Sequence, residues 1–138
     1  MMLQKKNEKF MILIIGAFLG LFSVGFGAYA EHGLKPHISE EEFRYLMTAI
    51  RYNQVNAVVI VAIGLILTSS HSIKELPVFK WCSRIFVIGS FLFSFSIYFS
   101  ILLGIKEITY LTPVGGMSLM VAWGLLLVSA YQLMRKSI

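Results

Sequence analysis

Four long stretches without a charged side chain constrain this chain more than any other feature. They cover residues 10–30, 52–70, 85–105 and 108–134. A bilayer core about 30 Å thick requires roughly 20 apolar residues in helical form, because backbone polar groups in lipid must be bonded within the helix. Thr112-Pro113 lies inside the fourth stretch and is typical of a helix start, with Thr as the N-cap. The predicted spans are therefore 10–30, 52–70, 85–105 and 113–134.

The composition agrees with a membrane protein. Hydrophobic residues make up 57% of the 138 residues and charged residues 14%, whereas soluble proteins contain about 25% charged residues. The net charge is +5, but the basic residues flank the apolar stretches and form no stripe with aromatic residues, which argues against nucleic-acid binding. We predict an all-α membrane protein, a compact bundle of four transmembrane helices that forms one integral-membrane domain over residues 1–138.

The segment 39–51 is predicted to be an amphipathic helix that leads into the second span. Ser39 and Glu42 have the spacing of a capping box. Apolar residues recur at helical spacing on one face, namely Phe43, Leu46, Met47 and Ile50. Two interpretations stay open: the segment lies in the membrane interface, or it projects into water as the end of the second span.

The distribution of Lys and Arg predicts the orientation of the chain. Cytoplasmic loops carry an excess of both residues. Eight of them lie on the side of the termini and four on the other side, so both termini are predicted to be cytoplasmic. One alternative is that Ala28-Tyr29-Ala30 before Glu31 is the cleavage site of a secretory signal peptide, although the apolar stretch is longer than such regions usually are.

Small residues at helical spacing predict where the helices touch, because helices in lipid associate through close packing. The first span contains such a face, and so does the third. The predicted packing residues are Gly16, Gly20, Ser23, Gly27, Ser96, Ser100 and Gly104. Whether the face of the first span serves one protomer or a dimer stays open.

Most of the unusual polar residues are predicted to lie at the outer ends of the spans. Polar side chains at membrane depth usually face the bundle interior or a water-filled cavity. The start of the fourth helix is expected to aim its N–H groups at the same region, which suits an anion or a lipid phosphate. Two interpretations stay open, a binding site and a purely structural cluster. The candidate outer cluster consists of Glu31, His32, Arg51, Asn53, Asn56, Tyr98, Thr112, Gly115 and Gly116.

No pattern in the sequence indicates catalysis or metal binding. His32 and His37 lack the spacing of a metal motif, and the serines of the third span have no positioned base. The single cysteine, Cys82, excludes an intrachain disulfide. We therefore predict no catalytic, cofactor-binding or metal-binding residues, and no enzyme.

Several segments together resemble a bacterial family of small membrane proteins, domain of unknown function 423. Gly25-Phe26-Gly27-Ala28 and His32-Gly33-Leu34-Lys35 are similar to its signature, and Thr112-Pro113-Val114-Gly115-Gly116 is similar to a later segment. The resemblance implies four spans in the cytoplasmic (plasma) membrane of a bacterium and a relation to vertebrate transmembrane protein 256. Relatives often carry His where Asn56 stands here, so a paired-His role is in doubt. The resemblance implies no established activity.

Three functions follow as hypotheses. The first is a non-enzymatic protein that binds membrane lipids or partners, as a homo-oligomer or within a larger membrane complex. The second is an oligomeric transporter or channel for small solutes or ions, with the outer cluster as its mouth. The third and least favoured is a membrane enzyme acting on a lipid or quinone through Glu31 and His32, because adjacent residues on a helix point about 100° apart.

Overall fold

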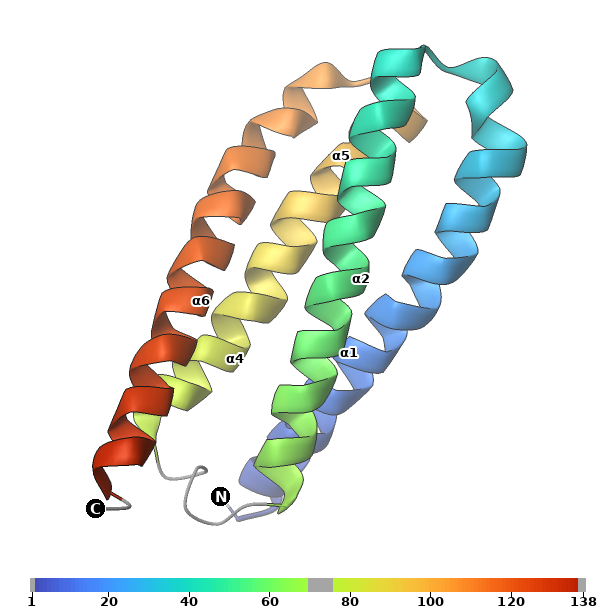
Figure 1. Cartoon of the computed structure of the whole chain (residues 1–138). Helices are drawn as coiled ribbons and strands as arrows, with labels where there is room; N and C mark the ends of the chain where they lie inside the picture. The colour runs from blue at the N-terminus through green and yellow to red at the C-terminus, as the bar shows by residue number, and fades with distance from the viewer. Residues whose placement is uncertain (1, 70–75, 137–138) are drawn as a thin grey trace.

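A computed structural model describes residues 2–69 and 76–136, and within these ranges all regular structure is helical. Four helical segments are long and apolar enough to cross a membrane, so the predicted all-α, four-span fold is confirmed. Figure 1 shows them side by side, with both termini at one end of the molecule. We call the opposite end, where α1 connects to α2 and α5 to α6, the distal end.

Each helical segment begins before the span predicted for it, and the third ends two residues earlier, at Leu103. Helix α1 covers Met2–Tyr29 and continues through a π-helical turn at Ala30–Leu34 and a 3-10 turn at Lys35–His37. Helix α2 covers Glu40–Ser69. The third segment comprises α4 at Pro77–Ser90, a π-helical turn at Phe91–Phe95 and α5 at Ser96–Leu103. The fourth comprises a 3-10 turn at Lys106–Tyr110 and α6 at Leu111–Lys136.

The amphipathic lead-in and the second span form one continuous helix. The predicted capping box is confirmed: the Ser39 N–H donates to a Glu42 carboxylate oxygen over 2.9 Å, and the Glu42 N–H donates to the Ser39 hydroxyl over 3.2 Å. Leu46 and Ile50 are buried within the bundle. The apolar face of the lead-in therefore packs on other helices, and the lead-in is not a separate helix.

The start of the fourth helix differs from the prediction. The 3-10 turn runs directly into α6, and the Leu111 N–H bonds to the carbonyls of Ile108 and Thr109. Thr112 lies inside the first turn of α6 and is not an N-cap, because the preceding turn already supplies the acceptors for this helix end. The start of α6 therefore does not offer the Leu111 N–H to a ligand, contrary to expectation.

The second and third segments occupy the middle of the molecule. Helix α1 packs mainly on α2, and α6 mainly on α4 and the π-helical turn that follows it. Figure 1 shows α1 and α6 on opposite sides, with α2 and the third segment between them. At the distal end, α2 packs on α5 of the third segment more than on α6 of the fourth.

Glycines permit the closest helix contacts. A Cβ atom on Gly16 would lie 2.8 Å from the Val61 backbone nitrogen, and one on Gly64 would lie 2.8 Å from the Leu13 Cα. A Cβ on Gly115 would lie 2.3 Å from the Phe93 backbone nitrogen, inside the π-helical turn. Such contacts draw α1 against α2 and α6 against the third segment.

Most of the predicted packing residues lie in helix contacts, but Gly104 does not. Gly20 and Gly27 face Ala57 and Ile50 across the α1–α2 contact, with a Cβ at 3.8 and 3.5 Å. Ser23, Ser96 and Ser100 are buried. Gly104 is exposed, has no neighbour within 4 Å of a built Cβ, and adopts φ +68°. It ends α5 as a left-handed cap, a conformation that glycine adopts without steric cost.

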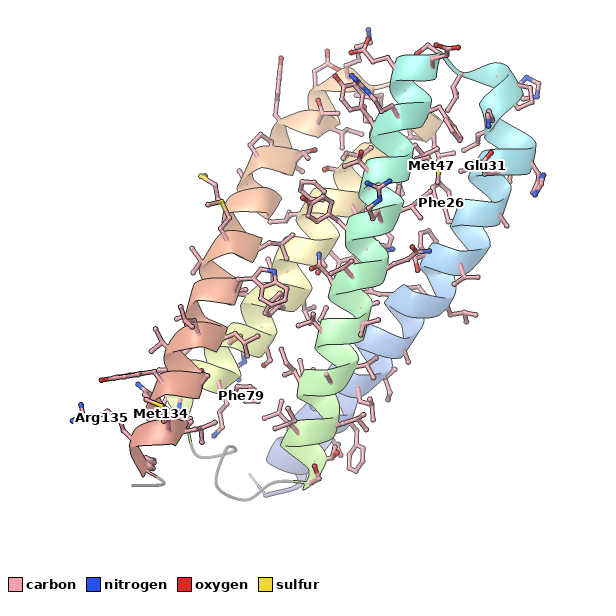
Figure 2. All side chains as sticks on the ribbon, in the orientation of Figure 1. Phe26, Glu31, Met47, Phe79, Met134 and Arg135 are labelled. Carbon is pink, nitrogen blue, oxygen red and sulfur yellow. The ribbon has the colours of Figure 1, made fainter. Side chains whose placement is uncertain are left out.

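The half of the bundle nearer the termini has an apolar core. Its buried side chains come from all four segments and include Leu19, Ile60, Ile63, Phe79, Phe86 and Leu119. Figure 2 places Phe79 at this end, near Met134 and Arg135. The half nearer the termini also buries the serines Ser83 and Ser129, whereas the buried amides, Asn53 and Asn56, lie in the other half.

Candidate functional site

A cavity of about 780 Å³ lies at the distal end. Its walls come from the first turns of α2, from α5, and from the first turns of α6 with the connection that precedes it. It is open to the surroundings of the bundle and not enclosed. We call it the distal cavity. Ligand sites in proteins typically have volumes of about 300–1,000 Å³, so its size suits a small molecule or part of a lipid.

The walls of the distal cavity change from polar to apolar along the helix axes. The rim contains charged and hydroxyl side chains from the beginning of α2 and from the α5–α6 connection, namely Ser39, Glu41, Glu42, Lys106 and Thr109. Deeper in the bundle the walls are Ile97, Ile101, Phe93 and Pro113. The cavity is therefore amphipathic, with its polar part at the end of the helices.

Ser100 lies between these two zones. It lines the distal cavity and is only 6% exposed. The Ser100 backbone carbonyl accepts the N–H groups of Gly104 and Ile105. Its hydroxyl makes no hydrogen bond with any other residue of the described ranges 2–69 and 76–136. Because no described residue bonds to this hydroxyl, it is available to a ligand in the cavity.

The candidate outer cluster does not form one site, because the structure distributes it among three places. Thr112 and Gly116 line the distal cavity. The Thr112 hydroxyl pairs with the Ser96 hydroxyl over 2.6 Å and so joins α6 to α5. Gly115 is buried against the Phe93 backbone and serves as a packing residue.

Asn53, Asn56 and Tyr98 form a buried layer behind the distal cavity. All three are at most 1% exposed. The Asn53 Nδ2 donates to the Tyr98 hydroxyl over 3.2 Å, which joins α2 to α5. Asn53 Oδ1 and Asn56 Nδ2 have no partner among the described residues. Phe22 and Phe26 of α1 pack on the Tyr98 ring, with ring centres 5.8 and 4.6 Å apart, and close this layer from the side.

Glu31, His32 and Arg51 lie on the other side of α2. All three are exposed and line a shallow groove of about 380 Å³ between α1 and α2. Glu31 pairs with Lys35 one helical turn away over 2.9 Å, an exposed contact of a kind that contributes little to stability. Figure 2 shows Glu31 beside Phe26 and Met47 at this end. These residues do not meet Thr112 or Gly116.

Sequence patterns missed the residues that form the rim of the distal cavity. Glu41 stands at a helix start and Lys106 in a loop, and both are exposed. Nothing in their sequence spacing distinguishes them from ordinary solvated residues. Ser100 was assigned to helix packing alone. The only signal for this location is the sequence order of the segments, which predicts that the starts of α2 and α6 and the end of α5 share one end of the bundle.

The fold and this arrangement define a four-span integral membrane protein with an amphipathic cavity at one end. No group of three or more His, Cys, Asp or Glu side chains that could hold a metal ion occurs within the ranges 2–69 and 76–136.

The family follows from comparison with other proteins. The family model described as protein of unknown function (DUF423) matches residues 26–116, more than half of the chain, and the chain belongs to this family. The inner membrane protein YgdD of Escherichia coli K12, of family UPF0382, is 32% identical over 132 residues, covering 96% of this chain and 97% of that protein. The membrane protein SH2409 of Staphylococcus haemolyticus, also of UPF0382, is 28% identical over 122 residues, covering 88% and 96%. No solved structure matches the chain.

Proposed function

We propose that this protein is a non-enzymatic membrane protein that binds a membrane lipid in the distal cavity. The observation that carries the proposal is the amphipathic lining of that cavity. The rim is polar and the deeper wall is apolar, which is the order of headgroup and acyl chains in one leaflet. Because the cavity is not enclosed, a lipid can enter it without crossing a closed bundle.

The apolar core near the termini makes transport a weaker proposal than lipid binding. Buried Leu19, Ile63 and Phe86 belong to a packed cluster in that half of the molecule. A path for ions or polar solutes would need polar groups through this half as well. This packed apolar cluster favours a binding pocket over the mouth of a transport path.

A cavity-filling substitution tests the proposal. Gly116 lines the distal cavity, and a Cβ added there would meet only the Phe93 ring at 3.7 Å. Gly116→Leu therefore inserts a side chain into the cavity without a backbone clash. Gly124 lies on the same helix and a Cβ there would meet nothing within 4 Å, so Gly124→Leu is the matched control.

The readout is the capture of a photoactivatable phospholipid by the full chain in liposomes, followed by identification of the labelled peptides. We expect label on α5 and the first turns of α6, reduced about tenfold or more in Gly116→Leu and unchanged in Gly124→Leu. Equal labelling of the two variants and the unmodified protein would contradict lipid binding in the distal cavity.

A further inference from the structure

The rim of the distal cavity carries charges of both signs on opposite walls. Glu41 and Glu42 come from the first turn of α2, and Lys106 comes from the connection before α6. Lys106 and Glu42 line the same cavity. Helix starts favour carboxylates, but Glu40 is in the same turn and does not line the cavity. The helix start alone therefore does not determine which carboxylates line the rim beside Lys106.

Both carboxylates keep an oxygen available for a ligand. One oxygen of Glu42 accepts bonds from the Ser39 N–H and hydroxyl, and one oxygen of Glu41 accepts the Tyr45 hydroxyl over 2.9 Å. The other oxygen of each makes no hydrogen bond with the described residues 2–69 and 76–136. These bonds fix the two carboxylates, and each offers a preorganised acceptor on the lining of the cavity.

A hydroxyl without a partner comes from α5. Ser100 lines the cavity and is 6% exposed, and its hydroxyl makes no hydrogen bond with the described residues 2–69 and 76–136. In a bilayer the ester groups of a phospholipid lie just below its phosphate and accept hydrogen bonds. From the rim inward, the lining thus offers carboxylates and an ammonium, then a hydroxyl, then apolar side chains.

We propose that the ligand of the distal cavity is a phospholipid whose headgroup carries a primary ammonium and one phosphodiester. This inference rests on the proposed function. The ammonium lies against Glu41 and Glu42, the phosphodiester lies beside Lys106, and a glycerol ester accepts a hydrogen bond from Ser100. All three contacts pair opposite charges or complete an unpaired group, which is the complementarity that determines specificity.

The same chemistry disfavours the other common headgroups. A lipid with net negative charge would place its headgroup beside two carboxylates and one lysine, and like charges disfavour binding. A trimethylated ammonium keeps the positive charge but has no N–H group to donate to Glu41 or Glu42. Discrimination between these lipids therefore depends on hydrogen bonds from the ammonium and on the sign of the charge.

A methylation series of the headgroup is the sharpest test. The full chain is purified in mild detergent and titrated with phosphatidylethanolamine, its mono- and dimethyl derivatives, phosphatidylcholine and phosphatidylglycerol, and bound lipid is counted by native mass spectrometry. We expect affinity to fall stepwise with each methyl group, by about tenfold over the series, which corresponds to about 1.4 kcal/mol. Phosphatidylglycerol is expected to bind most weakly.

Matched variants assign the discrimination to named carboxylates. The double variant Glu41→Gln with Glu42→Gln keeps the capping box, which accepts Gln as well as Glu, and is expected to bind all five lipids within about threefold of each other. Glu40→Gln, in the same turn but outside the cavity, is expected to keep the full preference.

The possible failures can be told apart. If all five lipids bind equally to the unmodified protein and Gly116→Leu removes all of them, the headgroup inference is wrong and lipid binding stands. If Gly116→Leu changes no titration, the proposed function fails together with the inference.

Discussion

Among the glycines of the described chain, Gly115 lies closest to a neighbouring backbone, that of the π-helical turn. A Cβ atom at position 115 would lie 2.3 Å from the Phe93 nitrogen and 2.7 Å from its Cα, and a backbone cannot yield as a side chain does. Gly115→Ala is expected to destabilise the fold by roughly 1–3 kcal/mol, as for overpacked cores, measured by thermal unfolding in detergent. Gly124→Ala has open space, and an equal loss there would contradict this explanation.

The Tyr98 hydroxyl permits a second test at this scale. It accepts the hydrogen bond of Asn53, whose Oδ1 has no partner in the described chain. Tyr98→Phe leaves the Asn53 side chain without this bond, so we expect a loss of about 1 kcal/mol. Tyr52→Phe is the control because the Tyr52 ring is about half exposed. If Tyr98→Phe leaves the thermal stability unchanged, the hydrogen bond makes no net contribution to stability.

How far single residues could be predicted depended on whether their role is local. Ser39 and Glu42 were identified because a capping box is a spacing of three within one helix. Thr112 and Gly104 were misassigned because their roles depend on what precedes or follows them. A 3-10 turn at Lys106–Tyr110 already leads into α6 before Thr112, and Gly104 ends α5 instead of touching a neighbour. Ser100 could not be singled out, because its missing partner is visible only in three dimensions.

At the scale of elements, the continuous helix α2 connects the distal rim to the bundle core. Its first turn carries Glu41 and Glu42, and the capping box at Ser39 fixes where that turn begins. The four long apolar helices could be predicted from the length and hydropathy of the four uncharged stretches. The π-helical turn at Phe91–Phe95, against which Gly115 packs, had no signal in the local sequence.

Removing the cap should therefore loosen the rim before it affects the bundle. Ser39→Ala removes the acceptor of the Glu42 N–H and is expected to cost about 1 kcal/mol, the usual cost of losing an N-cap. The measurement is hydrogen exchange of the full chain, in which the amides of Glu42 and Phe43 should exchange several-fold faster. Ser69→Ala, at the other end of α2, should leave these amides unchanged; uniform acceleration along α2 would mean that the cap acts globally.

At the scale of the whole molecule, the two ends differ in both charge and chemistry. Lys80, Arg84, Arg135 and Lys136 lie at the end that holds the termini, while Lys35, Arg44, Arg51 and Lys106 lie at the distal end with the cavity. The sequence-based count of Lys and Arg, eight for the side of the termini and four for the other, predicts the same polarity. If positive residues stay inside, the distal cavity opens in the outer leaflet, so its lipid would come from there.

Cysteine labelling decides this orientation. The native Cys82 is fully buried, so the unmodified protein should not react with a membrane-impermeant maleimide. The unmodified protein is therefore the negative control. Tyr110→Cys introduces a thiol at a distal position that is 78% exposed, and Lys136→Cys introduces one at the other end. Because the excess of Lys and Arg predicts cytoplasmic termini, intact cells should label Tyr110→Cys, and Lys136→Cys should react only after lysis. The reverse pattern would move the distal cavity to the cytoplasmic leaflet, and the lipid would then have to be supplied from the inner side of the membrane.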